Sequence, residues 1–458
     1  MLFPSMKHVL NFVLLYVDEV MLICTSDYLL KRRSIKYEQY LDLVTVSAIF
    51  EIAGCLAAGV LSDWRGRRLV AILSSAISFI GILLIYLSHS YSILILSRIA
   101  LGIGIGMGYL SIPIYIAELS PPFVRGFLAS FPEVLSSMGF LVASVIHMTL
   151  SKVSKHLEWL VFIALSATSF LIITIVLAMM PESPSWLMRQ GRVADATRIV
   201  TRCTRAPEEA HGRVNLMRQN IGLSADDTRD VVHSIPREEV RIDIFAWGEL
   251  IRSTPAIARV VLSVNYLQVI RQLAMIDDLL SSSDPLLVHA YITVDNDTQV
   301  GLLCVMCFRT ITLIAPMLMM DKYGRFKLVM ISIGGICMSM GLLGFLDFSI
   351  RSTNAYIGAQ NFFSVVCVFI LAGSYSLGLG PIPYIYNAEA FPYRLRAQGT
   401  SFAIAISRLV WYFMFLSSAT LYKFLHFGPV LIIRTVIIVV LMFLGIRNVR
   451  ETSLVNID

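Results

Sequence analysis

Charged residues are scarce in this chain of 458 residues. Asp, Glu, Lys and Arg make up 15% of it, whereas they form about a quarter of an average soluble domain. The hydrophobic share is 57%, and these residues come in long runs instead of alternating with charge. This pattern excludes soluble globular, disordered and fibrous proteins. A helix crosses a bilayer with about 20 mostly apolar residues, so the runs predict a polytopic helical membrane protein.

The sequence also lacks the clusters that carry enzyme chemistry. Its seven cysteines are scattered, and the CxxC pair of Cys304 and Cys307 has no second pair and no His or acid nearby, which indicates helix packing. The alternating glycines at 102–108 follow no predicted strand, so they indicate close helix contact and not a nucleotide loop. No nucleophile has a base at a suitable spacing. We therefore predict no enzyme activity, no metal and no cofactor.

The formal net charge of +6 does not indicate a nucleic-acid partner. The chain has no basic amphipathic segment and no cluster of basic and aromatic residues, which such binding requires. Lys and Arg collect on the cytoplasmic side of membrane proteins, so we interpret the excess as a signal of topology. The expected partners are the lipid bilayer and a small-molecule substrate.

Twelve apolar runs predict an all-α membrane protein with two sets of six transmembrane helices. The first set covers 8–24, 41–62, 69–88, 94–117, 127–150 and 157–180, and the second covers 255–275, 299–319, 328–348, 357–385, 399–422 and 427–446. An Arg-rich polar stretch separates the sets and is predicted to be cytoplasmic. The expected organisation is an N-terminal half (1–181), a cytoplasmic linker (182–253), a C-terminal half (254–446) and a cytoplasmic tail (447–458).

Basic residues in the connecting loops predict that both termini lie inside. The loops placed inside by this topology carry Arg65, Arg67 and Arg68, then Arg125, then Lys322, Arg325 and Lys327, then Arg394 and Arg396. The first outside loop is also basic and breaks the pattern. Asn296 begins a glycosylation sequon in a predicted outside loop, which agrees with the assignment. The plasma membrane is the default location.

Two junctions of the first half recur in the second. Residues 62–68 read Ser-Asp-Trp-Arg-Gly-Arg-Arg and residues 321–327 read Asp-Lys-Tyr-Gly-Arg-Phe-Lys, each between the second and third spans of its half. Between the fourth and fifth spans a Glu is followed seven residues later by an Arg, as Glu118 with Arg125 and Glu389 with Arg396. Parallel half-repeats of this kind are the architecture of rocker-type carriers.

With these junctions, Pro-Glu-Ser-Pro at 181–184 and Gly-Pro-Ile-Pro at 380–383 make the chain resemble a known family. It resembles the sugar porter branch of the major facilitator superfamily, to which facilitative glucose transporters and bacterial proton–sugar symporters belong. The resemblance spans nearly the whole chain. It implies the major facilitator fold and transport of a small solute, a sugar or polyol, by alternating access. ATP-driven transport is disfavoured.

The resemblance further implies a network of cytoplasmic acids and arginines that holds the outward-facing state. Carried over residue by residue, this conformational network comprises Asp63, Gly66, Arg67, Arg68, Glu118, Arg125, Glu182, Asp321, Gly324, Arg325, Glu389 and Arg396. Ser185 stands where the family usually has Arg, and Phe326 replaces the second Arg of the second turn. We therefore expect this network to hold the outward-facing state somewhat more weakly than it does in the family.

The substrate path departs most from the family. Neutral amides and aromatic rings bind sugar there, but in this chain Glu133 occupies the fifth-span Gln position and Arg408 an eleventh-span Trp position, while Arg309 lies near an eighth-span amide position. The seventh-span amide signature is absent, and the tenth-span Trp is a Tyr. The expected substrate-binding residues are Glu133, Asn265, Gln268, Gln272, Arg309, Tyr384, Arg408 and Trp411.

Charge inside a membrane costs about 2.5–3.5 kcal/mol per residue on insertion scales, so these substitutions leave three hypotheses open. The first is a sugar or polyol carrier, and the second is an organic anion or ion carrier on the same fold, which the buried arginines favour. The third is a non-transporting sensor, against which the retained switch residues argue. Protons are a further candidate partner, with Glu133 or Asp18 as the carrier.

The sidedness of the loop at 276–298 can be tested through its sequon. If Asn296 faces outward and is used, glycosidase treatment of protein made in a eukaryotic cell will increase its electrophoretic mobility. An Asn296→Gln variant is the control and should not respond. A Thr298→Cys variant that an impermeant thiol reagent cannot label from outside would contradict the assignment.

Overall fold

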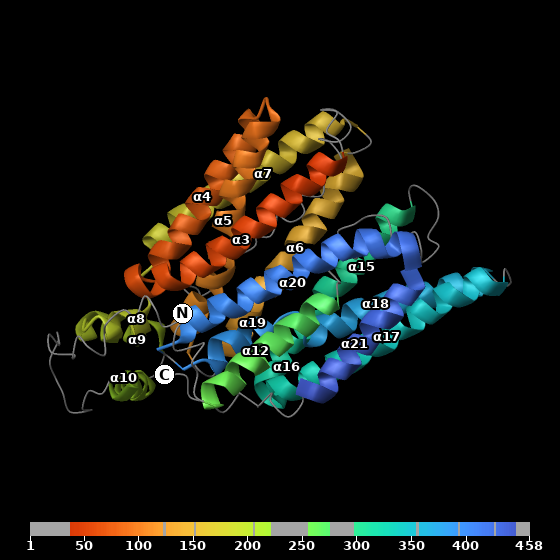
Figure 1. The fold of residues 1–458 in the computed structure, drawn as a ribbon. Helices are drawn as coiled ribbons and strands as arrows, with labels where there is room; N and C mark the ends of the chain where they lie inside the picture. Colours follow the sequence, from red (N-terminus) through yellow and green to blue (C-terminus); the bar gives the residue numbers. More distant parts are fainter. Residues whose placement is uncertain are drawn as a thin grey trace.

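A computed structural model describes residues 37–121, 125–150, 153–204, 207–220, 255–274, 297–353, 357–392, 394–425 and 427–445. These residues form helices and contain no strand (Figure 1). The N-terminal half contains α3 (Tyr37–Arg65), α4 (Arg67–Leu87), α5 (Tyr91–Leu119), α6 (Arg125–Leu150) and α7 (Lys155–Met179). The C-terminal half contains α12 (Pro255–Leu273), α15 (Asp297–Thr312), α16 (Ile314–Tyr323), α17 (Arg325–Thr353), α18 (Ile357–Leu377), α19 (Ile382–Ala390), α20 (Arg396–Leu425) and α21 (Phe427–Gly445).

Every predicted span from residue 41 onward coincides with helix, whereas 8–24 lies outside the described residues. Within the described part, ten helical segments are long and apolar enough to cross a membrane. The helix α12 is not one of them, because its amides and its arginines, Arg259 and Arg271, dilute its apolar character. Two predicted spans are each broken into two helices, after Thr312 and before Pro381. Proline in a first turn needs no hydrogen-bond partner for its nitrogen, which suits Pro316 and Pro383 to these restarts.

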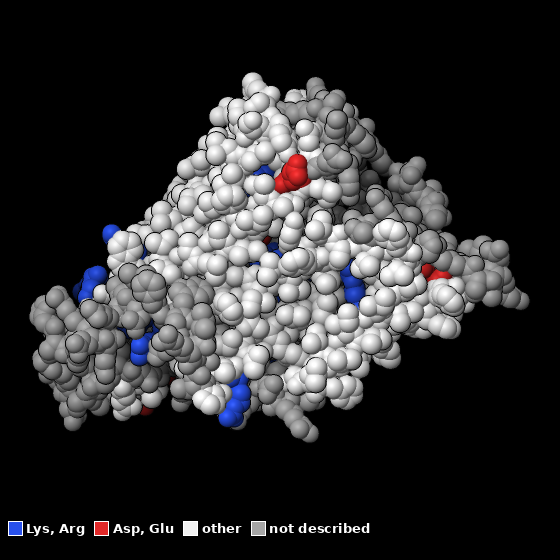
Figure 2. Space-filling model, in the orientation of Figure 1, with Lys and Arg blue, Asp and Glu red and all other residues white. Residues whose placement is uncertain are grey.

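The outer faces of the helices are apolar, as a bilayer requires. On α17, Ile331, Met338 and Phe345 recur every seven residues and are 61%, 69% and 61% exposed. Residues seven apart share one helix face, so this face points away from the bundle. Figure 2 shows a broad surface nearly free of Lys, Arg, Asp and Glu, with basic groups concentrated toward the linker helices. The charge distribution fits a molecule whose middle lies in lipid.

Close packing of α3, α4 and α5 depends on glycine, as the sequence predicts. A Cβ on Gly102 would lie 2.6 Å from the Ser47 carbonyl oxygen, and one on Gly106 would lie 2.1 Å from that of Glu51. On the neighbouring side of α5, a Cβ on Gly104 would lie 2.3 Å from Ser78 Oγ. Glycine lets helix backbones approach within membranes, and this approach fixes the core of the N-terminal half.

The connection between the halves carries three short helices, α8 (Pro184–Arg189), α9 (Val193–Cys203) and α10 (Pro207–Asn220). Ser183 Oγ accepts the Trp186 N–H at the start of α8, and Gly191 with φ 76° follows the helix end. The three helices share a small hydrophobic core that includes Leu187, Val200 and Val214. We call the end of the bundle that adjoins α8–α10 the linker side.

The two halves meet mainly in two places. At one, α3 packs along α20, and at the other α6 packs along α15 and α16, while α19 and α20 also contact α5. In Figure 1 the halves come together near the linker side, whereas α7 and α17 point away from each other at their opposite ends. This arrangement places residues of α6, α12, α15 and α20 at the interface between the halves.

The glycine packing predicts that replacing glycine by alanine affects stability differently at two sites. Gly106→Ala forces the backbones of α3 and α5 apart, and overpacking of this kind costs about 1–3 kcal/mol. A Cβ on Gly334 in α17 would instead meet no atom within 4 Å. Gly334→Ala should therefore leave the melting temperature of the detergent-solubilised protein unchanged or raise it, whereas Gly106→Ala should lower it. Equal melting temperatures of the two variants would contradict the packing argument.

Candidate functional site

Both halves carry the same tight turn on the linker side. Gly66 has φ 101° and Gly324 has φ 87°, a backbone region that glycine enters without a Cβ clash. Each glycine is followed by an arginine that opens the next helix, Arg67 in α4 and Arg325 in α17. The repeat seen in the sequence is therefore a repeat of backbone geometry, and it aims both arginines into the bundle.

Each of these arginines forms an ion pair with the repeated Glu of its own half. Arg67 Nε lies 3.2 Å from Glu118 Oε2, and Arg325 Nη2 lies 3.1 Å from Glu389 Oε1. All four residues are buried. Removing one partner of a buried pair leaves an uncompensated charge, which costs about 3–5 kcal/mol. The two pairs hold the linker-side ends of α4 to α5 and of α17 to α19.

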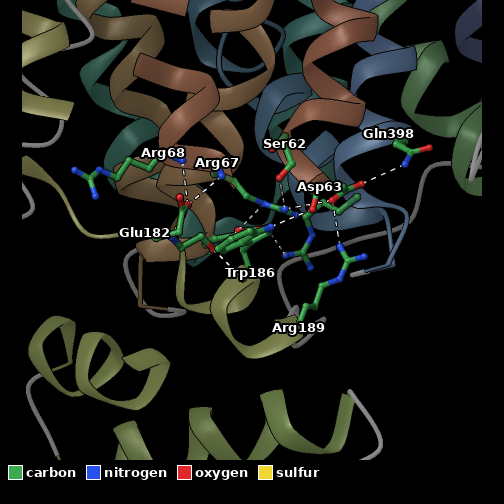
Figure 3. A network of polar contacts seen from close by, with 11 residues as sticks. Ser62, Asp63, Arg67, Arg68, Glu182, Trp186, Arg189 and Gln398 are labelled. Carbon is green, nitrogen blue, oxygen red and sulfur yellow. Dashed lines mark hydrogen bonds and ion pairs between the residues drawn. The ribbon is translucent and has the colours of Figure 1, made fainter. Parts of the chain in front are cut away.

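Two further contacts on the linker side cross from one half to the other. Arg396 Nη1 of α20 lies 3.8 Å from Glu118 Oε1, and Gln398 Nε2 donates to Asp63 Oδ2 at 3.4 Å. Asp63 also accepts from Arg189 Nη1 at 3.1 Å, which attaches α8 to α3 (Figure 3). The linker side is thus closed by polar contacts that would have to break for the halves to part there.

Three other residues that the resemblance placed in this network bind backbone. Glu182 Oε1 accepts the N–H groups of Arg67 and Arg68, each at 3.0 Å, so this carboxylate caps the start of α4 (Figure 3). Arg68 Nε donates to the Leu177 carbonyl and Arg125 Nε to the Ala117 carbonyl. The side chain of Asp321 and the sequon at Asn296 lie outside the described residues.

Deep inside the bundle, one carboxylate joins the halves a second time. Glu133 Oε1 of α6 accepts from Arg309 Nη2 of α15 at 2.9 Å, and Glu133 Oε2 lies 3.7 Å from Arg271 Nη2 of α12. The exposed fractions of these side chains are only 3%, 1% and 4%. Glu133 lies eight residues from the start of α6, about 12 Å along the axis, near the middle of a ~30 Å hydrocarbon layer.

Aromatic rings surround these arginines. Arg271 lies over the Tyr384 ring, 4.6 Å from its centroid, and donates to the Tyr384 hydroxyl at 3.1 Å. Arg309 lies 5.4 Å from the ring centroid of Tyr375. Cation–π contacts of this kind stabilise a desolvated guanidinium. The charges, the rings and the interface between the halves coincide, so we take this cluster as the centre of the candidate site.

Buried amides extend the centre along α12 and α19. Gln268, one turn from Arg271, has no hydrogen-bond partner for its amide nitrogen or oxygen among the described residues. The side chain of Asn387, one turn from Tyr384, likewise finds none in the described part of the chain. Burying an amide without a hydrogen bond costs at least about 1 kcal/mol. These two amides are therefore groups that a ligand rich in hydroxyls could satisfy.

The remaining predicted site residues lie near the centre or apart from it. Gln272 Nε2 donates to Ser407 Oγ at 2.8 Å, joining α12 to α20, and Asn265 Nδ2 donates to the Val261 carbonyl of its own helix. Arg408 crosses between the halves, with its guanidinium 3.9 Å from the ring centroid of Tyr109. Trp411 stacks on Phe415, with centroids 5.8 Å apart.

Several residues of the two sites escaped the sequence reasoning. Arg271 is a charge within a predicted span, so the argument applied to Arg309 would have selected it. Asn387 and Gln398 lie close to the recognised motifs but do not belong to them. Nothing in the sequence therefore singled out these two positions. Arg189 lies in the linker, where its pairing with Asp63 depends on how α8 folds back.

The contacts between the halves predict a shift in conformation when Arg396 is neutralised. Ser401 of α20 is fully buried against Gly59 of α3 on the linker side. A Ser401→Cys reporter should therefore be alkylated slowly, and about fivefold faster when Arg396→Gln is added, which corresponds to ~1 kcal/mol. Mass spectrometry of the reporter peptide gives the rate. Lys327→Gln, which removes an exposed charge, is the control and should leave the alkylation rate of the Ser401→Cys reporter unchanged. If Arg396→Gln also leaves that rate unchanged, Arg396 does not help to close the linker side.

Comparison with known proteins agrees with this architecture. Solved structures of the xylose transporter XylE share the fold: the form titled as a proton:xylose symporter bound to 6-bromo-6-deoxy-D-glucose aligns with a TM-score of 0.80 at 20% identity, covering 98% of this chain and 95% of that one. The inward-open form from E. coli aligns at 0.66 and 20% identity, covering 100% and 98%. The fold class predicted from the sequence is confirmed.

Sequence relatives are transporters as well. The chain is 32% identical to Polyol transporter 5 of Arabidopsis thaliana over 362 residues, 79% of this chain and 67% of that protein. It is 28% identical to Plastidic glucose transporter 4 of the same plant over 399 residues, 86% and 68% of the two chains. The sequence profile of the family described as "Sugar (and other) transporter" matches residues 20–458. The chain is an integral membrane protein and belongs to this sugar transporter family.

Proposed function

We propose that the protein carries a polyol or a sugar across a membrane by alternating access. The observation that carries the proposal is that two buried amides, those of Gln268 and Asn387, have no hydrogen-bond partner in the described part of the chain and lie one helical turn from the centre. Hydroxyl groups both donate and accept, so a polyhydroxylated solute can satisfy an amide nitrogen and an amide oxygen at once. Arg271 and Tyr384 lie one turn from these amides on their respective helices.

The relatives support this class of substrate. Several of them are named as polyol transporters and others as glucose transporters, and the fold is shared with a xylose symporter. The basic linker supports a cytoplasmic location for the linker side. We infer that the protein is in an outward-facing state, with the cytoplasmic end closed by the contacts of Glu118 and Asp63. The plasma membrane as its location stays a prediction.

A second substrate class is favoured by one specific observation. Two guanidinium groups, those of Arg271 and Arg309, meet at the centre of the site on a single carboxylate, that of Glu133. Guanidinium matches a carboxylate with two parallel hydrogen bonds. A sugar acid, which combines hydroxyls with a carboxylate, would use both the amides and the arginines. A non-transporting sensor gains no such support.

Uptake by purified protein in liposomes tests the proposal. We expect entry of labelled sorbitol or xylose to saturate and to be blocked by unlabelled polyols. Competition by gluconate but not by lactate would indicate a sugar acid. Stimulation by an inward proton gradient would add the proton as a partner. Absence of any saturable uptake, by protein that elutes as a single species and keeps a cooperative melting transition, would contradict transport of this substrate class.

The central ion pair predicts non-additive effects of two substitutions. Glu133→Gln leaves the two arginines without this carboxylate, and breaking a buried pair costs about 3–5 kcal/mol. Glu133→Gln combined with Arg309→Gln removes one charge of each sign, so the melting temperature should fall less than in the single variant. Thermal unfolding of both variants measures this. A double variant that melts at or below the temperature of Glu133→Gln would show that Glu133 and Arg309 do not stabilise each other.

The same double variant separates the two substrate classes. If the substrate is a neutral polyol, the double variant should retain sorbitol uptake because its Gln268 and Asn387 are intact. If the substrate is a sugar acid, competition by gluconate should be lost, because Arg309 no longer offers a guanidinium. Gln268→Leu is the matched test of the amide, and undiminished sorbitol affinity in this variant would place Gln268 outside the substrate site.

A further inference from the structure

A shallow cavity of about 510 Å³, largely open to solvent, lies between α9 and α10 on the linker side. Its lining consists of Val193, Ala194, Thr197, Arg198, Thr201, Arg202 and Arg218. Among the described residues, three arginines and no acid therefore line this cavity. Its volume falls within the range of ligand sites, about 300–1,000 Å³, and several basic groups lie on the described surface toward the linker helices (Figure 2).

These three arginines differ from their neighbours in the linker. Arg192 pairs with Asp195, Arg189 pairs with Asp63, and Arg213 donates to the Glu118 carbonyl. In contrast, Arg198, Arg202 and Arg218 make no ion pair with any described residue, and Arg218 Nε is buried with no hydrogen-bond partner there. Arg198 and Arg202 are exposed and Arg218 is half-buried, so their guanidinium groups are accessible to a ligand from solvent.

The spacing of the arginines places like charges close together. Arg198 and Arg202 are four residues apart on α9, and like charges at that spacing destabilise a helix by about 0.2–0.5 kcal/mol. Arg202 and Arg218 lie in the last turns of α9 and α10, where cations interact well with the helix dipole. That interaction does not account for Arg198 in the middle of α9, nor for the convergence of all three.

The walls of the cavity are held in place by other contacts. Val200 on α9 packs with Val214 and Met217 on α10 in the small linker core. On α10, Arg213 is buried and donates to the Glu118 carbonyl at 2.6 Å, which attaches α10 to the end of α5. These contacts hold the backbone of α9 and α10 in place, so binding an anion requires ordering of only the arginine side chains.

We propose that this cavity binds an anion that carries phosphate groups. Arginine forks donate two parallel hydrogen bonds to phosphate oxygens, and three guanidiniums match the charge of more than one phosphate. The hydroxyls of Thr197 and Thr201 donate to carbonyls of their own helix, so recognition rests on the arginines. The phosphate belongs either to a soluble metabolite or to the headgroup of a membrane lipid.

Binding of pyrophosphate to the full-length protein in phosphatidylcholine nanodiscs, measured by calorimetry, tests the site. We expect saturable binding by the unmodified protein and at least tenfold weaker binding when Arg202→Gln and Arg218→Gln are combined. Arg259→Gln, which removes an exposed arginine of α12, is the matched control and should bind normally. Since the readout is binding, it does not depend on whether the protein transports a polyol.

A second set of nanodiscs distinguishes the two sources of phosphate. If the natural ligand is a lipid, discs that contain phosphatidylinositol monophosphate should weaken pyrophosphate binding in proportion to their content of this lipid. If the ligand is soluble, pyrophosphate should bind equally well in both kinds of disc. Either result supports the site. Absence of saturable binding, or equal affinity of the double variant and the Arg259→Gln control in protein with an unchanged melting temperature, would overturn it.

Discussion

The buried carboxylate of Glu118 is the contact on which the arrangement of the whole molecule depends. It pairs with Arg67 within its own half and lies 3.8 Å from Arg396 of the other half. The backbone carbonyl of Glu118 accepts from Arg213 of the linker, and Ser183 Oγ donates to the carboxylate. A charge this deeply buried needs several partners, and here the partners come from three separate parts of the chain. A movement of any one part away from Glu118 would therefore break one of these contacts.

The same requirement operates at the centre of the site with a different consequence. Glu133 meets Arg309 and Arg271 from the opposite half, so the ion pairs themselves span the route between the halves. On the linker side the contacts close one end of the molecule. At the centre Arg271 contacts Tyr384 and lies one helical turn from Gln268, at the place where we propose that a solute binds. A solute that competes for these groups would act directly on a contact that joins the halves.

The sequence predicted most of the fold because the bilayer restricts the chain so strongly. Long apolar runs located the spans from residue 41 onward, and the repeated Gly-Arg turn located equivalent corners of both halves. The breaks after Thr312 and before Pro381 were not predicted, because the apolar runs continue through them. The helices α8, α9 and α10 were also missed as a unit, since their small core forms only when Val200 meets Val214.

The sequence by itself determined which apolar runs form the long helices from residue 41 onward, which residues are unusual for the family, and that Glu133, Arg309 and Arg408 lie within those runs. The tertiary structure decided how those charges are paired. Glu182 could have bound an arginine side chain, yet its carboxylate caps α4 because the start of that helix lies within 3.0 Å. Arg271 and Glu133 are far apart in the chain, and only the packing of the two halves brings them together. Ion pairs act over a few ångströms, a scale that sequence spacing cannot specify between separate helices.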